Sequence, residues 1–145
     1  MKPQKISLIS LISLLLFSAI ALAGDFDWMK DFNVQAKMDQ NGFQARLETR
    51  FKIGDADINL VLGSVDEPAD AYMLCRLGEM SQRPTAQVIE QFNANRGKGW
   101  GVLAKSLGIK PGSKDFQALK NGQDLYDNKT NKGDTKRQSK KMVRK

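Results

Sequence analysis

The most unusual local composition in this chain is the run Arg-Gly-Lys-Gly-Trp-Gly at residues 96–101. Glycines before a helix expose backbone N–H groups, and two basic side chains among them add positive charge. The run therefore predicts an anion-binding site, with Arg96, Lys98, Gly99, Trp100 and Gly101 as the candidate residues. It is not a Walker phosphate loop, because no Gly-Lys pair is followed by Ser or Thr. In the alternative, the glycines only permit a sharp turn and the tryptophan packs into the core.

A second concentration of positive charge lies at the end of the chain. Residues 128–145 contain eight basic residues and one acid. No apolar pattern continues after Tyr126, so we expect a disordered tail that associates weakly with an anionic lipid or polymer surface. The basic residues expected to make this contact are Lys136, Arg137, Lys140, Lys141, Arg144 and Lys145. A solvated tail without a target is the alternative, and the absence of aromatic side chains for base stacking argues against nucleic acid.

Several kinds of chemistry are excluded by composition. The chain has no histidine and one cysteine, so it can form neither a Ser-His or Cys-His couple nor an imidazole metal site. One thiol also rules out a Cys-x-x-Cys redox pair within the chain. We therefore expect no metal, no cofactor and no catalytic residue of these classes. Cys75 is expected to be a buried apolar side chain, with an intermolecular disulfide as the alternative.

Carboxylates are the remaining groups that could support catalysis. Asp66, Glu67 and Asp70 are close in sequence and could supply an acid pair for a small hydrolase. Negative side chains are equally expected at a helix start, because they interact favourably with the helix dipole. The acids from Asp55 onward also match a calcium-binding loop in part, but Leu60 stands where that loop needs glycine.

The first 23 residues have the three parts of a secretory signal peptide. Two lysines precede an uncharged run of 18 residues, and the run ends in Ala21-Leu22-Ala23. We expect cleavage after Ala23, a periplasmic or secreted protein, and no integral membrane segment after cleavage. An uncleaved membrane anchor is the alternative. A lipoprotein box would need cysteine where this chain has Asp25.

Apolar and polar side chains alternate over residues 32–53. A period of two is typical of half-buried strands, and Asn41-Gly42 between the two apolar runs is a strong signal for a type I′ hairpin turn. A two-residue loop pairs positions whose numbers add up to 83, so Phe32 is expected opposite Phe51. The alternation at residues 58–62 predicts a third strand.

Beyond residue 67 the pattern changes to that of helices. Pro68 follows two acids, which is typical of a helix start, and Met73, Leu77 and Met80 then recur at helical spacing. Further helices are expected from about residue 84, over about residues 102–107, and over residues 114–121 between a Ser113 cap and Gly122.

These elements predict an α+β fold. A three-stranded antiparallel β-meander over about residues 32–62 would pack against three or four short helices over about residues 67–122. The predicted organisation is a signal peptide at residues 1–23, a single α+β domain at residues 24–127 and a disordered basic tail at residues 128–145. The net charge of the chain is +7; because the signal contributes +2 and the tail +7, the body is expected to carry −2.

Residues 97–101 and 107–113 carry a resemblance. Gly-Lys-Gly-Trp-Gly leads into a short helix and then into Leu-Gly-Ile-Lys-Pro-Gly-Ser. This string resembles a segment shared by small uncharacterised exported bacterial proteins, and the resemblance covers roughly residues 68–122. It implies a bacterial periplasmic location and identifies no catalytic residue.

The sequence favours an exported binding or interaction module over an enzyme. Its folded body would bind a protein or a small anion, and its tail would contact an anionic surface. The alternatives are the carboxylate-dependent hydrolase and an extracellular nucleic-acid or polyanion binder. The last of these would need a continuous basic face that joins the tail to Arg83, Arg96 and Lys98.

Overall fold

A computed structural model describes residues 25–126, and the expected signal peptide and basic tail lie outside this range. The described residues form seven helices and no strand, so the predicted α+β fold is wrong. The helices are α1 (Trp28–Met38), α2 (Gln40–Phe51), α3 (Asp55–Ser64), α4 (Pro68–Ser81), α5 (Thr85–Ala94), α6 (Trp100–Ser106) and α7 (Lys114–Asn121). None of these helices combines the length and the apolar character needed to span a membrane.

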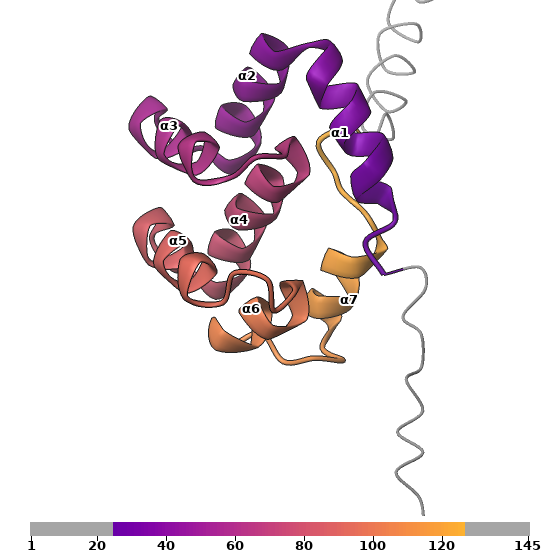
Figure 1. Ribbon diagram of the computed structural model, residues 1–145, viewed down its shortest axis with the longest axis vertical. Helices are drawn as coiled ribbons and strands as arrows, with labels where there is room; N and C mark the ends of the chain where they lie inside the picture. The colour runs from indigo at the N-terminus through magenta and orange to yellow at the C-terminus, as the bar shows by residue number, and fades with distance from the viewer. Residues whose placement is uncertain (1–24, 127–145) are drawn as a thin grey trace, which may run out of the picture.

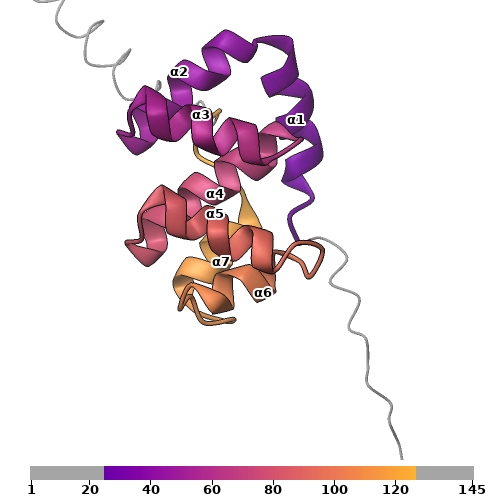
Figure 2. The same ribbon diagram turned by 60° about the vertical axis from the view of Figure 1, so that its left-hand side comes forward.

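Helix α4 lies at the centre of the arrangement (Figures 1 and 2). It contacts α1, α2, α3, α5 and α7. Half of its residues are buried, among them Tyr72, Met73 and Leu77, which are at most 1% exposed. A helix that is apolar nearly all round must be surrounded by other elements, and here the other helices pack around it. The buried residues between 25 and 126 are all apolar or aromatic.

The predicted hairpin turn at Asn41-Gly42 is the first turn of helix α2. Helices α1 and α2 meet at Asp39, whose side chain accepts a hydrogen bond of 2.9 Å from the backbone N–H of Gly42. An aspartate that accepts from a backbone N–H in the first turn is a helix N-cap. The chain therefore changes direction between two helices at Asp39, and the predicted pairing of Phe32 with Phe51 does not form.

The alternation of apolar and polar side chains predicted strands wrongly because a pattern that repeats every two residues also repeats every four. Residues four apart lie on one face of a helix. In α1, Phe32 and Ala36 are buried, as one face of a helix requires. Val34 and Met38 belong to the same period-two set, yet they are 63% and 83% exposed. A strand would have buried all four side chains on one face. The exposure of Val34 and Met38 therefore decides in favour of a helix.

Helical spacing, with buried residues three or four positions apart, also explains the other two elements that were predicted as strands. In α2, Phe43 and Leu47 are buried, whereas Thr49 is exposed. In α3, Ile58 and Val61 are buried three residues apart, and Leu60 is 45% exposed. The third predicted strand is therefore a helix as well.

The helices predicted in the second half of the chain are confirmed. Helix α4 begins at Pro68, and α5 buries Val88 and Ile89. Helix α7 is capped by Ser113, whose hydroxyl accepts from the backbone N–H of Phe116 at 3.2 Å. Only α6 differs in its start, because it begins at Trp100 rather than near residue 102.

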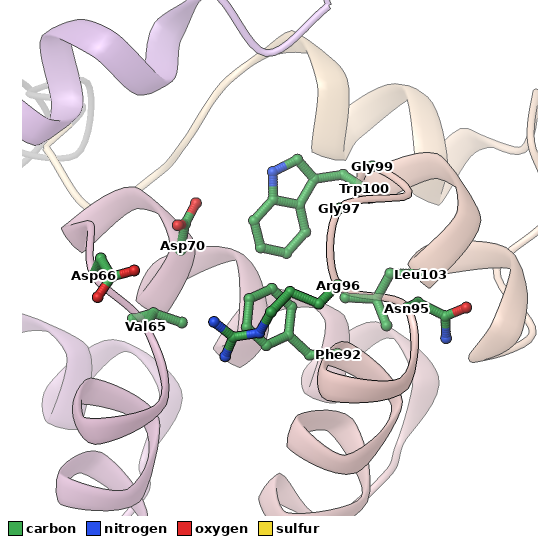
Figure 3. Close-up of a pocket in the computed structure, with 10 residues that line it drawn as sticks. All are labelled: Val65, Asp66, Asp70, Phe92, Asn95, Arg96, Gly97, Gly99, Trp100 and Leu103. Atoms are coloured by element: carbon green, nitrogen blue, oxygen red, sulfur yellow. The ribbon is translucent and has the colours of Figure 1, made fainter.

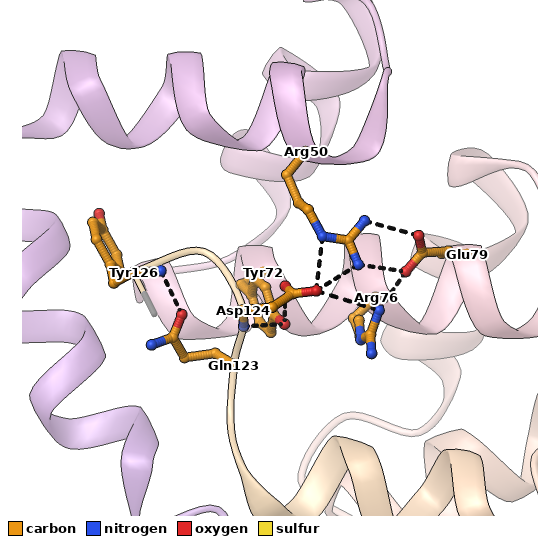
Figure 4. A network of polar contacts seen from close by, with 7 residues as sticks. All are labelled: Arg50, Tyr72, Arg76, Glu79, Gln123, Asp124 and Tyr126. Atoms are coloured by element: carbon orange, nitrogen blue, oxygen red, sulfur yellow. Dashed lines mark hydrogen bonds and ion pairs between the residues drawn. The ribbon is translucent and has the colours of Figure 1, made fainter. Parts of the chain in front are cut away.

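The segment after α7 returns along α4 towards α1 and α2 (Figure 1). Leu125 is buried there, and Tyr126 packs edge-on against Phe32 with ring centroids 5.2 Å apart. Asp124 provides the polar part of this junction (Figure 4). Its carboxylate accepts from the Tyr72 hydroxyl at 2.8 Å and from the guanidinium of Arg50 at 2.8 Å.

Candidate functional site

A pocket of about 400 Å³ lies between the junction of α3 with α4 and the junction of α5 with α6 (Figure 3). Its volume falls in the range of small-molecule sites. It is lined by Val65, Asp66, Asp70, Phe92, Asn95, Arg96, Gly97, Gly99, Trp100 and Leu103. The glycine-rich run and the acids at the start of α4 thus line one site, although they are about thirty residues apart in sequence.

The glycine-rich run positions Trp100 at the pocket. Gly97 and Gly99 have φ angles of +80° and +91°, a region that other residues adopt only with strain. A Cβ atom at either position would meet nothing within 4 Å, so the backbone angle alone accounts for glycine there. The turn ends α5 and starts α6 at Trp100, whose indole is half-buried.

One wall of the pocket is a stack of two aromatic rings and a guanidinium. The rings of Phe92 and Trp100 are nearly parallel, at 17°, with centroids 5.8 Å apart. The guanidinium carbon of Arg96 lies 5.2 Å from the centroid of Phe92. Arg96 Nη2 also donates to the carbonyl of Ser64 at 3.3 Å and to Oδ1 of Asn93 at 3.1 Å. Arg96 is therefore held in place by partners of the protein itself.

Two carboxylates line the pocket as well. Asp66 is exposed and Asp70 is half-buried, and neither side chain has a hydrogen-bond or ion-pair partner among residues 25–126. Glu67, between them, is instead paired with Lys37 at 2.7 Å. Burial raises the pKa of Asp70, and the negative charges of Glu67 and Asp66 raise it further.

Three of the five residues predicted for anion binding line this pocket, namely Arg96, Gly99 and Trp100. Lys98 and Gly101 do not line it. Helix α6 is only seven residues long, so we assign no anion site to its N-terminus. The pocket also contains two acids for its single basic side chain, which local sequence at residues 96–101 did not indicate.

Phe92 and Val65 are lining residues that sequence reasoning did not assign to the site. Phe92 lies in α5 and packs against the core. Its second role, as the ring beneath Trp100, depends on the reversal of the chain at the glycines. No sequence signal marked the contact between the two rings, because the sequence alone does not determine the backbone path of the turn that separates them.

Comparisons with protein-family models, with curated proteins and with solved structures found no match to this chain. The resemblance of residues 97–113 to small exported bacterial proteins therefore stays a prediction. Function has to be inferred from the chemistry of the site.

An adjoining pocket of about 260 Å³ is lined in part by the same loop between α3 and α4. The two pockets share Val65 and Asp66. The second pocket is lined by neutral amide side chains, Gln40, Asn41 and Gln44, and by apolar side chains such as Leu62. It contains no basic side chain among its lining residues.

Other candidate chemistry from the sequence is located as follows. Asp55 and Asp57 lie in the first turn of α3, not in a calcium-binding loop. Residues 25–126 contain no group of three or more potential ligands of the His, Cys, Asp and Glu types that could hold a metal ion. Cys75 is buried in α4, and loss of solvation raises its pKa to about 12. Its thiol is therefore protonated at neutral pH and a poor nucleophile.

Proposed function

We propose that the protein is an exported binding module and that the pocket between the α3–α4 and α5–α6 junctions holds its ligand. One observation carries the proposal. The half-buried ring of Trp100, which stacks on Phe92, lines a pocket of about 400 Å³ together with two carboxylates. Binding sites for small molecules are concave, aromatic and apolar, with a few polar groups that fix the orientation of the ligand. Export is proposed from the signal-like residues 1–23 alone.

Trp100 makes the proposal testable by fluorescence. The chain has two tryptophans, and the other, Trp28, has a buried Nε1 without a hydrogen-bond partner among the described residues. Trp28→Phe removes that indole and leaves Trp100 as the only tryptophan. We expect Trp100 emission in this variant to change saturably with at least one member of a panel of small cationic, anionic, zwitterionic and neutral compounds.

Two basic residues of the glycine-rich run provide a matched pair of variants. Arg96 lines the pocket and Lys98 does not, although they are two residues apart and carry the same charge. In the Trp28→Phe background, Arg96→Gln is expected to alter the affinity of any ligand found, and Lys98→Gln to leave it within about twofold. Equal effects of both variants would show that bulk charge, rather than the pocket, controls binding. If no compound changed Trp100 emission, the pocket would not be the binding site.

The tail supports a second and weaker contact in this proposal. Residues 128–145 lie outside the described residues, and their eight basic side chains are the observation that supports it. Contacts between exposed charges are screened over about 8 Å at physiological salt. Binding of the protein to anionic vesicles is therefore expected at low salt, to weaken as salt rises, and to be lost on deletion of residues 128–145. Salt-independent binding would contradict the electrostatic contact.

A carboxylate-dependent hydrolase is the second candidate function. The observation that favours it is that Asp66 and Asp70 line one pocket and that the pKa of Asp70 is raised. A raised pKa makes a carboxyl easier to protonate, so that it can act as a general acid while a second carboxylate acts as a base. Turnover of a panel of glycosides and esters that is abolished by both Asp70→Asn and Asp66→Asn would support this candidate. Activity retained in either variant would exclude the pair as catalytic residues.

A further inference from the structure

The charges in the main pocket are unequal in number and in what they already contact. Two carboxylates, Asp66 and Asp70, face one guanidinium, Arg96. Arg96 donates to Ser64 and Asn93 and lies over the ring of Phe92. Neither carboxylate has a side-chain partner among residues 25–126. The electrostatic demand of the pocket is therefore for a positive charge, not for an anion.

Asp70 is the residue at which this demand is strongest. Its side chain is half-buried, so water solvates its charge incompletely, and Asp66 and Glu67 repel it. Burial, and then this repulsion, raise the pKa of Asp70. A cation in the pocket would offset the repulsion and would favour the ionised form of Asp70.

The aromatic wall indicates which kind of cation fits. Figure 3 shows the indole of Trp100 on the side of the pocket next to Asp70. The face of a tryptophan ring attracts cations that carry their charge on a partly apolar group, and quaternary ammonium ligands are recognised in this way. A bare metal ion is a poorer match, since no group of three or more potential ligands is found among residues 25–126.

We propose that the pocket selects a small organic ammonium ion, whose charge lies against Asp66, Asp70 and the ring of Trp100. This inference rests on the proposed function and adds the chemical class of the ligand. It also reverses the polarity that the run at residues 96–101 predicted. The remaining side chain, Arg96, is left to contact a hydroxyl, carbonyl or acid oxygen elsewhere on the same molecule.

Choline and its neutral carbon isostere, 3,3-dimethylbutan-1-ol, differ in charge but scarcely in shape, and they provide the test. Each is titrated into the ¹⁵N-labelled protein, and the two indole N–H signals are followed. Trp100 reports on the pocket, and Trp28, which packs against Phe32 and Tyr72, is the internal control. We expect choline to shift the Trp100 signal saturably and the isostere to bind about tenfold more weakly or not at all. A parallel titration with butylammonium distinguishes a primary from a quaternary ammonium.

Variants then locate the charge. Asp70→Asn and Asp66→Asn each remove one carboxylate with little change of shape, and each should weaken choline binding about tenfold. Asp66 is exposed, so its variant keeps the test valid if Asp70→Asn fails to fold. Asp115→Asn is the matched control, because Asp115 also lies in the first turn of a helix and is outside this pocket. The affinity of the Asp115→Asn variant for choline should stay within about twofold of that of the unmodified protein.

The outcomes separate this inference from the proposed function. If the neutral isostere, or acetate, shifts Trp100 as strongly as choline does, the pocket binds ligands but does not select cations, and the inference is overturned. Equal losses in Asp70→Asn and Asp115→Asn would overturn it as well, since net charge would then explain the binding. If neither these probes nor the wider panel moves the Trp100 signal, the inference and the proposed function both fail.

Discussion

Asp124 joins the segment after α7 to α2 and α4, and its replacement tests whether this junction stabilises the fold. Its Oδ1 accepts from the hydroxyl of Tyr72 at 2.8 Å, and its Oδ2 accepts from Arg50 at 2.6 and 2.8 Å. Arg50 also pairs with Glu79 at 2.8 Å. Asp124→Asn keeps an acceptor for Tyr72 and removes the charge, whereas Asp124→Ala removes both (Figure 4).

The expected magnitudes follow from burial. The Asp124 side chain is 42% exposed, so its ion pair with Arg50 is screened by water, and Asp124→Asn should lower the free energy of unfolding by about 0.5–1 kcal/mol. Tyr72 is 1% exposed. Asp124→Ala leaves its hydroxyl without this acceptor, which costs about 1–3 kcal/mol. Glu90→Gln is the control, because Glu90 is exposed, and its effect should lie within about 0.5 kcal/mol.

The pH dependence gives the sharper test. Burial opposes ionisation of Asp124, but hydrogen bonds from Arg50 and Tyr72 outweigh it and lower the pKa of Asp124 below its usual value. The hydrogen bond from Arg50 likewise lowers the pKa of Glu79. A carboxyl with a lowered pKa stabilises the folded state above its unfolded pKa, about 4, and loses this contribution as pH falls through the folded value. The difference between the unmodified protein and Asp124→Asn should therefore be present at pH 7 and shrink steadily below pH 4.

Urea unfolding followed by circular dichroism at a series of pH values between 7 and 2 measures this difference. Tyr72→Phe combined with Asp124→Ala completes a double-mutant cycle, in which direct contact predicts effects that do not add. Two results would refute the argument. One is a difference between Asp124→Asn and the unmodified protein that is as large at pH 2 as at pH 7. The other is strict additivity of the two replacements.

Three further predictions test the helical fold, the burial of the Cys75 thiol and the cleavage of the predicted signal peptide. Leu47→Ala should lower the free energy of unfolding by about 2–5 kcal/mol, because the side chain is fully buried. Val34→Ala, at a position 63% exposed in α1, should change it by less than about 0.5 kcal/mol. Large losses in both variants would contradict the helical arrangement of α1 and α2. Cys75, with its pKa raised to about 12, should react with a thiol reagent at pH 8 only as fast as the protein unfolds, and rapid labelling of the folded protein would contradict its burial. Intact mass of the exported protein should show Gly24 as the first residue, and a full-length chain retained in the membrane would contradict cleavage after Ala23.

The second half of the fold was predictable because its signals are local and unambiguous. Pro68 can begin a helix but cannot continue one, and Ser113 caps α7 through a hydrogen bond that its type favours. The first half was not predictable in the same way. The apolar residues at every second position of α1 are compatible with a strand and with a helix, and only the exposure of Val34 and Met38 distinguishes them.

The α1–α2 junction contains one signal for a helix that the sequence prediction did not use. Asp39 is a preferred N-cap residue and stands three positions before Gly42. The prediction rested instead on the association of Asn-Gly with hairpin turns. A cap and a turn use the same residue types, so local composition could not separate the two, and only packing against α4 does.

The candidate site shows the same limit of local sequence in its charge. The glycine-rich run correctly located a turn that brings Arg96 and Trp100 to a pocket. The run predicted an anion because residues 96–101 contain only the basic and aromatic part of the pocket and none of its acids. Asp66 and Asp70 come from the start of α4, and the packing of α3, α4 and α5 together brings them to the same pocket as the run.

The charge of the ligand that a pocket selects therefore depends on which charged side chains have no partner in the folded protein. Arg96 is the basic residue that suggested an anion, but the fold gives it a carbonyl, an amide oxygen and an aromatic ring as partners. The acids could be explained as ordinary helix-start residues, but Asp70 is half-buried beside Trp100 and has no side-chain partner among residues 25–126. A ligand gains most from groups that the protein has desolvated without satisfying. By that criterion the half-buried carboxylate of Asp70, and not the guanidinium of Arg96, determines what the pocket binds.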